Sequence, residues 1–404
     1  MSTPPRKPRQ ISGPKPIPLQ WGAASAKARG PVIPFFNDPA RNAIGGFVNG
    51  IQRAVAVAEG GLNPAYRANL HNTHPTFMFE RSDRWKDIVS LDPFGHTVTE
   101  DFADLLKKGY RIQPTIGVTQ AQLTIPEVQQ AMADGTLKPD GKVLTWAGKI
   151  VVTKAYIDQV WHLPGVAKRL GVEEKHLRET LYKETGQYKD LIDRPDLDVF
   201  VPPIAGTSVY ILGDPTKVGD PDVHHTVRIH DACHASDSWG SDICTCRPYF
   251  VYAALRCIES AQNGGIGILI YNHSTEGRAM GDVLKLLIYN ARKRDPEGDT
   301  AERYFTHAEN VAGIKDMRIY SLSTDPLLWL GVTRIHHLCS MSNYKFNALQ
   351  QAGIEVIDRF EIPEEFIPAD AQVEITAKKS DGYHTKAVPS DWELSATVGR
   401  SLTP

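Results

Sequence analysis

Three cysteines that could bind a metal ion lie close together in the second half of the chain, at Cys233, Cys244 and Cys246. Their thiolates are soft ligands that suit Zn²⁺. A closed structural zinc site has four protein ligands, but Cys257 falls within a predicted helix and Cys339 is distant in the sequence. Three ligands leave a position for a water molecule, whose pKa zinc can lower to about 7. The spacing therefore predicts a hydrolytic site with one zinc ion per chain.

Two other interpretations of these cysteines stay open. His230 or His234 could complete a structural zinc site as a fourth ligand, or the cysteines could be buried thiols without a metal. The signature of the zinc deaminases, His-x-Glu followed by Pro-Cys-x-x-Cys, does not occur here.

A second group of residues, downstream of the cysteines, could bind an anion. Glu276-Gly277-Arg278 follows a predicted buried strand, a position that favours ligand binding in α/β sheets. Arginine and lysine donate to phosphate, and hydroxyl groups complete such a site. The chain has no Walker A loop and no Gly-x-Gly-x-x-Gly turn. The remaining candidates are Thr300, Asp316, Arg318, Ser340 and Lys345.

Regular alternation of strands and helices must position these groups. It is strongest in residues 206–365 and predicts an α/β unit with a mixed or parallel sheet and flanking helices. The expected strands are 209–212, 226–229, 265–271, 318–322 and 355–357, and the expected helices are 249–262, 278–292, 326–330 and 346–351.

The rest of the chain divides by composition. Residues 1–30 are basic and rich in proline and predict a flexible arm, whereas residues 31–205 are expected to form an α+β extension domain. Within that domain, 47–58 predicts a helix and 143–156 predicts a hairpin with a helix following. Residues 206–365 form the expected catalytic domain. Residues 366–404 lack clear periodicity and are expected to be a C-terminal tail.

Residues 166–181 scan as helix, turn, helix, which is also a DNA-binding pattern. The second helix carries Glu173, Glu174, Glu179 and Glu184, which would repel phosphates, so we expect an ordinary helical pair.

The overall composition excludes several classes of protein. Hydrophobic residues make up 41% and charged residues 23% of the 404 residues, which are globular values. The formal net charge of −2 gives no basic field for nucleic acid or an anionic membrane. No apolar run is long enough for a transmembrane helix, no signal peptide is evident, and five cysteines are an odd number for a disulfide framework. These features predict a soluble cytoplasmic protein that binds neither nucleic acid nor membrane.

Taken in order, the motifs of residues 206–365 resemble the catalytic domain of GTP cyclohydrolase II. The resemblance rests on Arg-x-His-x-x-Cys from Arg228, the cysteines, Glu276-Gly277-Arg278, Asp316 with Arg318, and Lys345. The long N-terminal extension and Cys-Thr-Cys-Arg-Pro-Tyr249 are similar to the uracil-regulated, GTP cyclohydrolase II-like branch of uracil catabolism.

This resemblance implies a role for each matched position. Cys233, Cys244 and Cys246 would bind the catalytic zinc. Asp316 matches a proton acceptor, Arg318 a nucleophile at the α-phosphate and Tyr289 a tyrosine that assists ring opening. A guanidinium is not readily deprotonated, so stabilisation of phosphate charge is the simpler role for Arg318. The implied substrate-binding residues are Arg228, Ile229, His230, Asp231, Tyr249, Glu276, Gly277, Arg278, Thr300, Ser340 and Lys345.

The chain also departs from the family pattern. Ala232 replaces a pocket glutamate and Tyr249 replaces a glutamine, and a site that loses such polar groups no longer selects the same base. The favoured hypothesis is a zinc cyclohydrolase that opens the ring of a uridine nucleotide, UMP or UTP. A GTP cyclohydrolase of the riboflavin type and a catalytically inactive nucleotide sensor are the alternatives. The resemblance further implies Mg²⁺ with the substrate phosphates and a homodimer.

Overall fold

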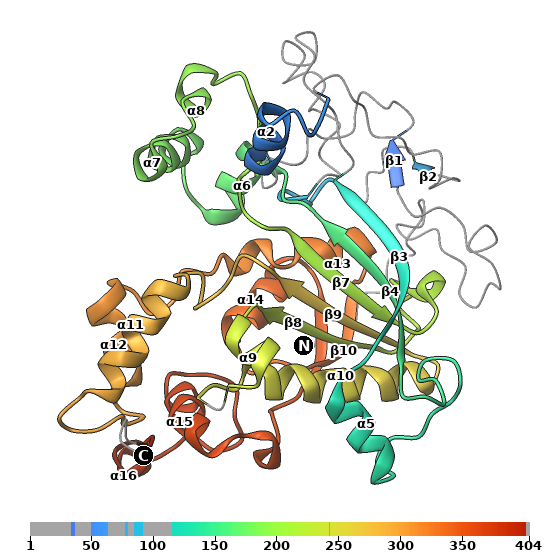
Figure 1. Ribbon diagram of the computed structural model, residues 1–404, viewed down its shortest axis with the longest axis vertical. Coiled ribbons are helices and arrows are strands. Elements are labelled where there is room, and N and C mark those ends of the chain that lie inside the picture. Colours follow the sequence, from blue (N-terminus) through green and yellow to red (C-terminus); the bar gives the residue numbers. More distant parts are fainter. Residues whose placement is uncertain are drawn as a thin grey trace, which may run out of the picture.

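The computed structural model describes residues 34–36, 50–63, 77–79, 85–91, 115–241 and 243–400. The predicted arm, residues 1–30, lies outside the described residues. A seven-stranded mixed sheet forms the centre of the molecule (Figure 1), in the order β11-β10-β8-β9-β7-β4-β3. The strands are β3 (Ile116–Leu123), β4 (Ile150–Ile157), β7 (Thr207–Leu212), β8 (His225–Asp231), β9 (Ile266–Asn272), β10 (Arg334–Leu338) and β11 (Glu355–Arg359).

The sheet changes character in its middle. The strands β11, β10, β8 and β9 run parallel to one another, whereas β7, β4 and β3 continue the sheet with antiparallel pairs. This arrangement confirms the predicted mixed α/β class.

Alternating side chains of the strands build one core on each face of the sheet. On β9, Ile268 joins the core that contains Leu327 and Leu349, from α13 (Asp325–Leu330) and α14 (Asn343–Gln351). Leu269 joins the core that contains Ile258 and Ile375, from α10 (Cys246–Gln262) and α15 (Gln372–Ser380). The molecule is therefore three-layered around this sheet, with α10 crossing its face in Figure 1.

Shorter elements complete the described part of the chain. None of its helices is both long and apolar enough to cross a membrane. The remaining strands are β1 (Pro34–Phe36), β2 (Phe77–Phe79), β5 (Trp161–His162) and β6 (Val199–Phe200). The remaining α-helices are α2 (Gly50–Ala58), α5 (Pro126–Ala133), α6 (Leu163–Leu170), α7 (Glu174–Thr185), α8 (Asp190–Asp193), α9 (His234–Trp239), α11 (Asp282–Lys293), α12 (Tyr304–Ala312) and α16 (Asp391–Ala396).

Two local expectations need correction, and two others are confirmed. Residues 318–322 form no strand, because Tyr320–Leu322 is a 3₁₀ turn. The helix expected from 278 begins only at Asp282, because Arg278 and Ala279 have positive φ angles of 58° and 64°. The hairpin expected over 143–156 is confirmed, because Leu144 forms an antiparallel bridge with Ile150 and the Val151 amide donates to the Val143 carbonyl oxygen at 2.9 Å. Its second arm is the long strand β4, and the helix α6 follows after the two-residue strand β5. The helical pair over 166–181 is confirmed as α6 and α7.

Two features cross the segment boundaries expected from composition. Strands β3 and β4 come from residues 31–205, yet β4 pairs with β7, which belongs to the expected catalytic domain. The pairing runs from Thr153 opposite Ile211 to Ile157 opposite Thr207. Residues 366–404 contain α15 and α16, and Ile375 of α15 lies in a core of the sheet. Both flanking segments therefore contribute to the central fold.

Candidate metal and nucleotide site

The candidate site lies where three neighbouring parallel strands end. β8 ends at Asp231, β9 ends at Asn272 and β10 ends at Leu338. The carboxyl ends of parallel strands meet at one edge of a sheet, where α/β proteins bind ligands. The segments that follow these strands carry the cysteines, the Glu-Gly-Arg turn and the Ser340–Lys345 region respectively.

The three predicted metal ligands converge. The Sγ atoms of Cys233, Cys244 and Cys246 all lie within 4.8 Å of one another, and those of Cys233 and Cys244 are 3.7 Å apart. Cys246 is the first residue of the 17-residue helix α10, where the helix dipole favours a thiolate. Three sulfur donors at this separation fit the ligand set of a zinc ion with one open position.

The close packing of the three thiols disfavours their ionisation in the absence of a cation. The hydrogen bond with Cys233, together with burial, raises the pKa of the Cys244 thiol to about 12. Three thiols packed so closely cannot all ionise unless a positive charge balances them. A divalent cation supplies that charge and stabilises the thiolates.

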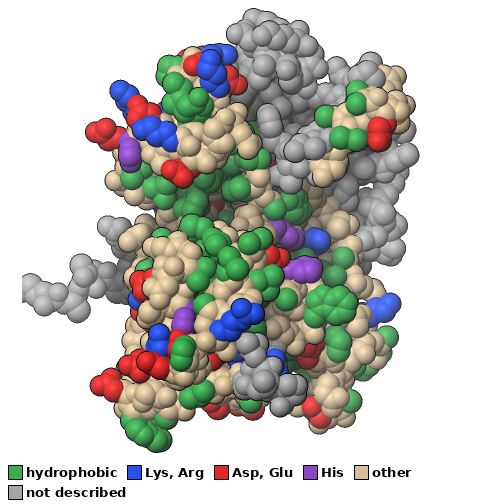
Figure 2. All heavy atoms as spheres, turned by 60° about the vertical axis from the view of Figure 1, so that its left-hand side comes forward, with side chains coloured by type: hydrophobic (Ala, Val, Ile, Leu, Met, Phe, Trp, Pro, Cys, Tyr) green, Lys and Arg blue, Asp and Glu red, His purple; other side chains and the backbone are tan. Residues whose placement is uncertain are grey.

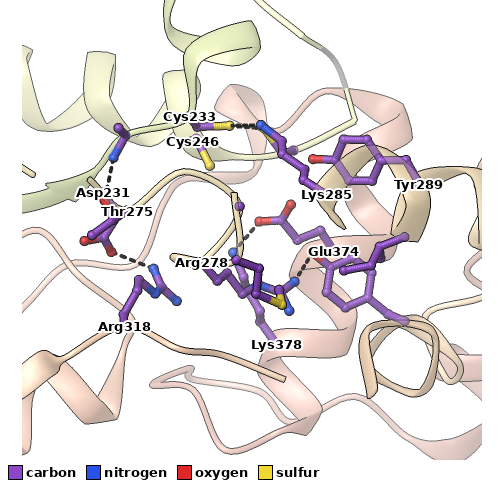
Figure 3. Close-up of a pocket in the computed structure, with 16 residues that line it drawn as sticks. Asp231, Cys233, Cys246, Thr275, Arg278, Lys285, Tyr289, Arg318, Glu374 and Lys378 are labelled. Atoms are coloured by element: carbon purple, nitrogen blue, oxygen red, sulfur yellow. Dashed lines mark hydrogen bonds and ion pairs between the residues drawn. The ribbon is translucent and has the colours of Figure 1, made fainter. Parts of the chain in front are cut away.

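A cavity opens directly on the cysteines, and we call it the metal cavity (Figure 3). From α11, Lys285 points to Cys233, with 3.2 Å between Nζ and Sγ, and also donates to Glu276 at 2.5 Å. Tyr289 lies one turn further along α11 and lines the same cavity. Burial raises the pKa of Tyr289 well above its usual value, so its hydroxyl stays protonated and can donate a hydrogen bond.

The turn from Glu276 to Gly281 forms one wall of the metal cavity. Gly277, Arg278 and Ala279 all have φ between 58° and 64°, which is unusual for the two residues that carry a Cβ. The turn directs the Arg278 guanidinium to the carbonyl oxygen of Lys315, at 3.0 Å, and to the hydroxyl of Tyr304. Both partners are neutral.

A second cavity, which we call the basic cavity, adjoins the first. The two cavities share four residues, which are Asp231, Cys246, Arg318 and Lys378. Four hydrogen-bonding or cationic groups of the predicted nucleotide site line only the basic cavity, namely Arg228, His230, Ser340 and Lys345.

Asp231 is the electrostatic centre of the basic cavity. Its Oδ2 lies 2.6 Å from Nη1 of Arg318 and 2.6 Å from Nζ of Lys345. Burial alone would raise the pKa of Asp231, but Lys345 and Arg318 lower it far below its usual value. Arg318 also donates to Asp316, at 2.5 Å, so that two carboxylates hold one guanidinium (Figure 3 shows the Asp231 bond).

The predicted residue Tyr249 is positioned from α10. The Arg228 guanidinium stacks on its ring, 4.0 Å from the centroid, and the hydroxyl donates to the carbonyl oxygen of Phe360. Arg228 also donates to the carbonyl oxygen of Cys339, at 2.9 Å. The Tyr249 hydroxyl is therefore already hydrogen-bonded within the protein, so a ligand in the basic cavity could contact only the ring of Tyr249.

His230 lines the basic cavity and also belongs to a buried hydrogen-bond network. Its Nε2 lies 3.2 Å from Asp237, which also accepts from the Tyr271 hydroxyl at 2.7 Å and from the Cys233 amide at 2.9 Å. Burial lowers the pKa of His230 below its usual value, although Asp237 opposes the effect. This network fixes the start of the loop that carries Cys233.

Some predicted site residues lie apart from the two cavities. Thr300 lines neither cavity and is buried opposite Val398. The Ile229 side chain belongs to the core, and only its carbonyl oxygen contacts the site, accepting from Lys345 at 2.7 Å. Asp316 and Glu276 line neither cavity but bind residues that do, namely Arg318 and Lys285.

Sequence reasoning missed Lys285, Glu374 and Lys378, which all line the metal cavity. Glu374 and Lys378 form an ion pair one turn apart on α15, and Glu374 also accepts from Thr245 at 3.1 Å. The i, i+4 spacing of the pair was a readable signal for a helix, but nothing local indicates that this helix reaches the cysteines.

Comparison with known proteins places two family regions in the chain. Residues 7–184 match the family model described as GTP cyclohydrolase N terminal, and residues 205–361 match the model for GTP cyclohydrolase II.

Two curated relatives match nearly the whole chain. Uracil-regulated protein 1 of Schizosaccharomyces pombe is 44% identical over 395 residues, which cover 95% of this chain and 89% of the relative. A Lachancea kluyveri protein named URC1, provisionally described as a GTP cyclohydrolase, is 44% identical over 398 residues, covering 96% and 89%. The riboflavin biosynthesis protein RibBA of Aquifex aeolicus is 31% identical over 136 residues, which cover 34% of this chain and 31% of that protein.

Proposed function

The chain belongs to the GTP cyclohydrolase II family, and from this premise we propose that it is a zinc-dependent cyclohydrolase that opens the base ring of a uridine nucleotide by hydrolysis. The observation that carries this proposal is that the metal cavity and the basic cavity share Cys246, Asp231 and Arg318. A nucleotide whose phosphate lies in the basic cavity can therefore present its base to the metal cavity.

Cys233, Cys244 and Cys246 would hold the zinc ion, which when bound supplies a Lewis acid that activates water for attack on a ring carbon. Lys285, 3.2 Å from the Cys233 sulfur, would offset part of the negative charge of three thiolates. Tyr289, with its protonated hydroxyl, would donate a hydrogen bond or a proton to the departing ring nitrogen.

Arg318 would stabilise phosphate charge rather than attack phosphorus. A nucleophilic guanidine would have to be neutral, but Asp231 and Asp316 both bind this side chain. Although burial favours the neutral form, the charge of Asp231 raises the pKa of Arg318 well above its usual value. A permanently charged guanidinium held between two carboxylates suits electrostatic binding.

The choice of a uridine nucleotide rests on the residues that would surround the base. Ala232 lines the metal cavity without a side-chain hydrogen-bonding group, whereas Tyr249 lines the basic cavity and offers only its ring. Position 232, where the family pattern has a glutamate, therefore offers no partner for the amide edge or amino group of guanine. The name of the Schizosaccharomyces pombe relative, uracil-regulated protein 1, agrees with this choice.

A second candidate, GTP ring opening, is favoured by one observation. The catalytic region is similar to the riboflavin biosynthesis protein of Aquifex aeolicus, at 31% identity. This candidate would require that Ala232 and Tyr249 are tolerated changes within a guanine site.

The deciding experiment incubates the zinc-loaded chain with UMP, UTP or GTP, with and without Mg²⁺. Loss of the uracil chromophore supports the proposal. Release of formate from GTP with no change in the uridine nucleotides would replace it with the second candidate. Binding of any nucleotide without turnover would favour a sensor.

We propose a homodimer as the solution state. The outer face of α11 exposes Val283, Leu286 and Leu287, on a side of the molecule where Figure 2 shows hydrophobic side chains gathered. Light scattering on the full chain tests this assembly, and Leu286→Glu should shift a dimer towards monomer.

A further inference from the structure

Carboxylates in and around the basic cavity already neutralise most of its positive charge. Its cationic side chains are Arg228, Arg318, Lys345 and Lys378. Three of the four already bind a carboxylate. Asp231 binds Arg318 and Lys345, Asp316 binds Arg318 again, and Glu374 binds Lys378. One net positive charge remains on these seven side chains.

Arg228 carries the charge that stays unpaired. Among the described residues, its guanidinium contacts only neutral groups, which are the Cys339 carbonyl oxygen, the His230 ring and the Tyr249 ring. It is 8% exposed, and its Nε has no hydrogen-bond partner although the atom is buried. A buried cation with an unused donor, lining a cavity, calls for an anionic partner.

Asp231 determines how much of the positive charge of Arg318 and Lys345 is left to bind an anionic ligand. Its carboxylate is 11% exposed and binds Arg318 and Lys345 at 2.6 Å each. The charge of Asp231 therefore already balances part of the positive charge of both side chains before a ligand binds. An anion approaching those two cations also approaches Asp231, which repels it more strongly as the anion's charge rises.

We propose, resting on the function proposed above, that the site takes a nucleoside monophosphate, and that Asp231 is the specificity-determining residue that excludes triphosphates. A monophosphate carries about −1.5 to −2 charges at neutral pH, which Arg228 and a share of Lys345 and Arg318 balance. Each additional phosphoryl group adds negative charge. Because Asp231, Asp316 and Glu374 already pair with the other cations that line the basic cavity, none of these cations is free to balance that added charge. Two further cations without a carboxylate bond lie close by, but Arg278 lines the metal cavity, and Arg359, which donates to the Ser340 carbonyl oxygen at 3.3 Å, lines neither cavity.

Calorimetric titration of the zinc-loaded full chain with UMP and with UTP tests the proposal without any variant. UMP should bind about tenfold or more tightly than UTP, because the further phosphoryl groups of UTP bring negative charge close to Asp231 with no free cation to balance it. The titrations are made without Mg²⁺, because a bound Mg²⁺ would cancel two of the negative charges of UTP. Equal or tighter binding of UTP under this condition would overturn the charge limit.

Asp231→Asn removes the charge while keeping the shape of the side chain. It should raise the affinity for UTP relative to UMP by about tenfold, since Arg318 and Lys345 are then free to bind phosphate. Asp222→Asn, at an exposed position, removes the same charge far from any cavity-lining residue and should leave the ratio unchanged. An unchanged ratio in a folded Asp231→Asn protein would remove Asp231 from this role.

The outcomes separate this inference from the proposed function. Tight UMP binding without ring opening refutes the cyclohydrolase but supports the charge limit. Ring opening of UTP in preference to UMP would support the cyclohydrolase but refute the charge limit. If only guanine nucleotides bind, the uridine proposal falls, and GMP against GTP then decides the charge limit by the same criterion. Failure of every nucleotide to bind overturns both.

Discussion

At the scale of single residues, Cys244 gives a direct test of metal binding. Its side chain is buried, and its Sγ lies 3.7 Å from the Sγ of Cys233, so the two sulfurs could bind the same zinc ion. Cys244→Ser should remove the stoichiometric zinc and reduce turnover by about a thousandfold or more, since a hydroxyl is a poor replacement for a thiolate on zinc. Metal analysis of the purified protein and a turnover assay measure both.

The matched control for that variant is Cys257→Ser. Cys257 is fully buried in α10 and belongs to the hydrophobic core, and it lines neither cavity. This control should lower the stability but keep the zinc. Full zinc content in Cys244→Ser would mean that the cluster is not the metal site.

Lys345 predicts a pH dependence. Burial lowers its pKa to about 8, although Asp231 opposes the shift. The side chain is positive below that pH and neutral above it, so nucleotide affinity should fall as pH rises through about 8. The phosphate itself does not change charge there, since its second pKa is about 6. Titrations between pH 7 and 9.5 should show a loss of about tenfold.

Lys345→Arg separates this titration from other effects of high pH, because arginine stays charged throughout. The variant should bind nucleotide with an affinity that no longer falls above pH 8. If wild-type affinity is flat across the range, Lys345 does not bind the phosphate in its charged form.

At the scale of elements, the turn between β9 and α11 contains the two residues other than glycine, Arg278 and Ala279, that have a positive φ among the described residues. A Cβ on Gly277 would lie 2.9 Å from the Gly281 carbonyl oxygen and 3.0 Å from the Lys285 Cβ. Gly277→Ala should therefore displace Lys285 from the cysteines, in addition to the penalty of about 1 kcal/mol for a positive φ. Turnover should fall by at least about tenfold.

Gly313→Ala is the matched control, because Gly313 also has a positive φ, of 74°, but has nothing within 4 Å of its Cβ position. It should lower the melting temperature by less than Gly277→Ala, because it carries only the positive-φ penalty, and it should leave turnover intact. Equal activity losses in the two variants would show that the turn does not position the site.

The same turn shows what could and could not be predicted from the sequence. The buried strands β8 and β9 and the helix α10 follow from their apolar patterns, because burial of one face selects that spacing. Arg278 and Ala279 have no local preference for positive φ, so the late start of α11 was not predictable from them. Ile319, Tyr320 and Leu322 favour a strand, yet this segment turns back, and Asp316 there binds both Arg318 and the Tyr320 hydroxyl.

The residues of the candidate site also fall into those that could be predicted from the sequence and those that could not. The cysteines are close in sequence and chemically distinctive, so their convergence was predictable. Lys285 and Lys378 reach the metal cavity only through the packing of α11 and α15, and tertiary contacts of that kind leave no local pattern. The positions that sequence reasoning missed are therefore those that depend on distant elements.

At the scale of the whole molecule, the extension and the catalytic segment share one sheet. β4 supplies five residue pairs to β7, and Ile157 and Ala155 lie in the same core as Val209 and Ile211. A second connection is the buried Asp325 of α13, which accepts from the amides of Val89 and Ser90, at 2.9 and 2.8 Å. The catalytic segment therefore depends on the preceding residues for one edge of its fold.

This dependence predicts the behaviour of a fragment that begins at residue 206. Without β4, the strand β7 becomes an exposed edge with unpaired amides and carbonyls, and Val209 and Ile211 lose part of their packing. Fragment 206–404 should aggregate or show no cooperative thermal transition. Fragment 115–404 retains β3 and β4 and should unfold cooperatively at a temperature below that of the full chain, because it lacks the contacts to Asp325. Calorimetry and zinc analysis of the two fragments measure the difference. A fragment 206–404 that is monodisperse, binds one zinc ion and melts with the full chain would show that the extension is dispensable for the catalytic fold, and its role would then have to be sought in assembly or substrate access.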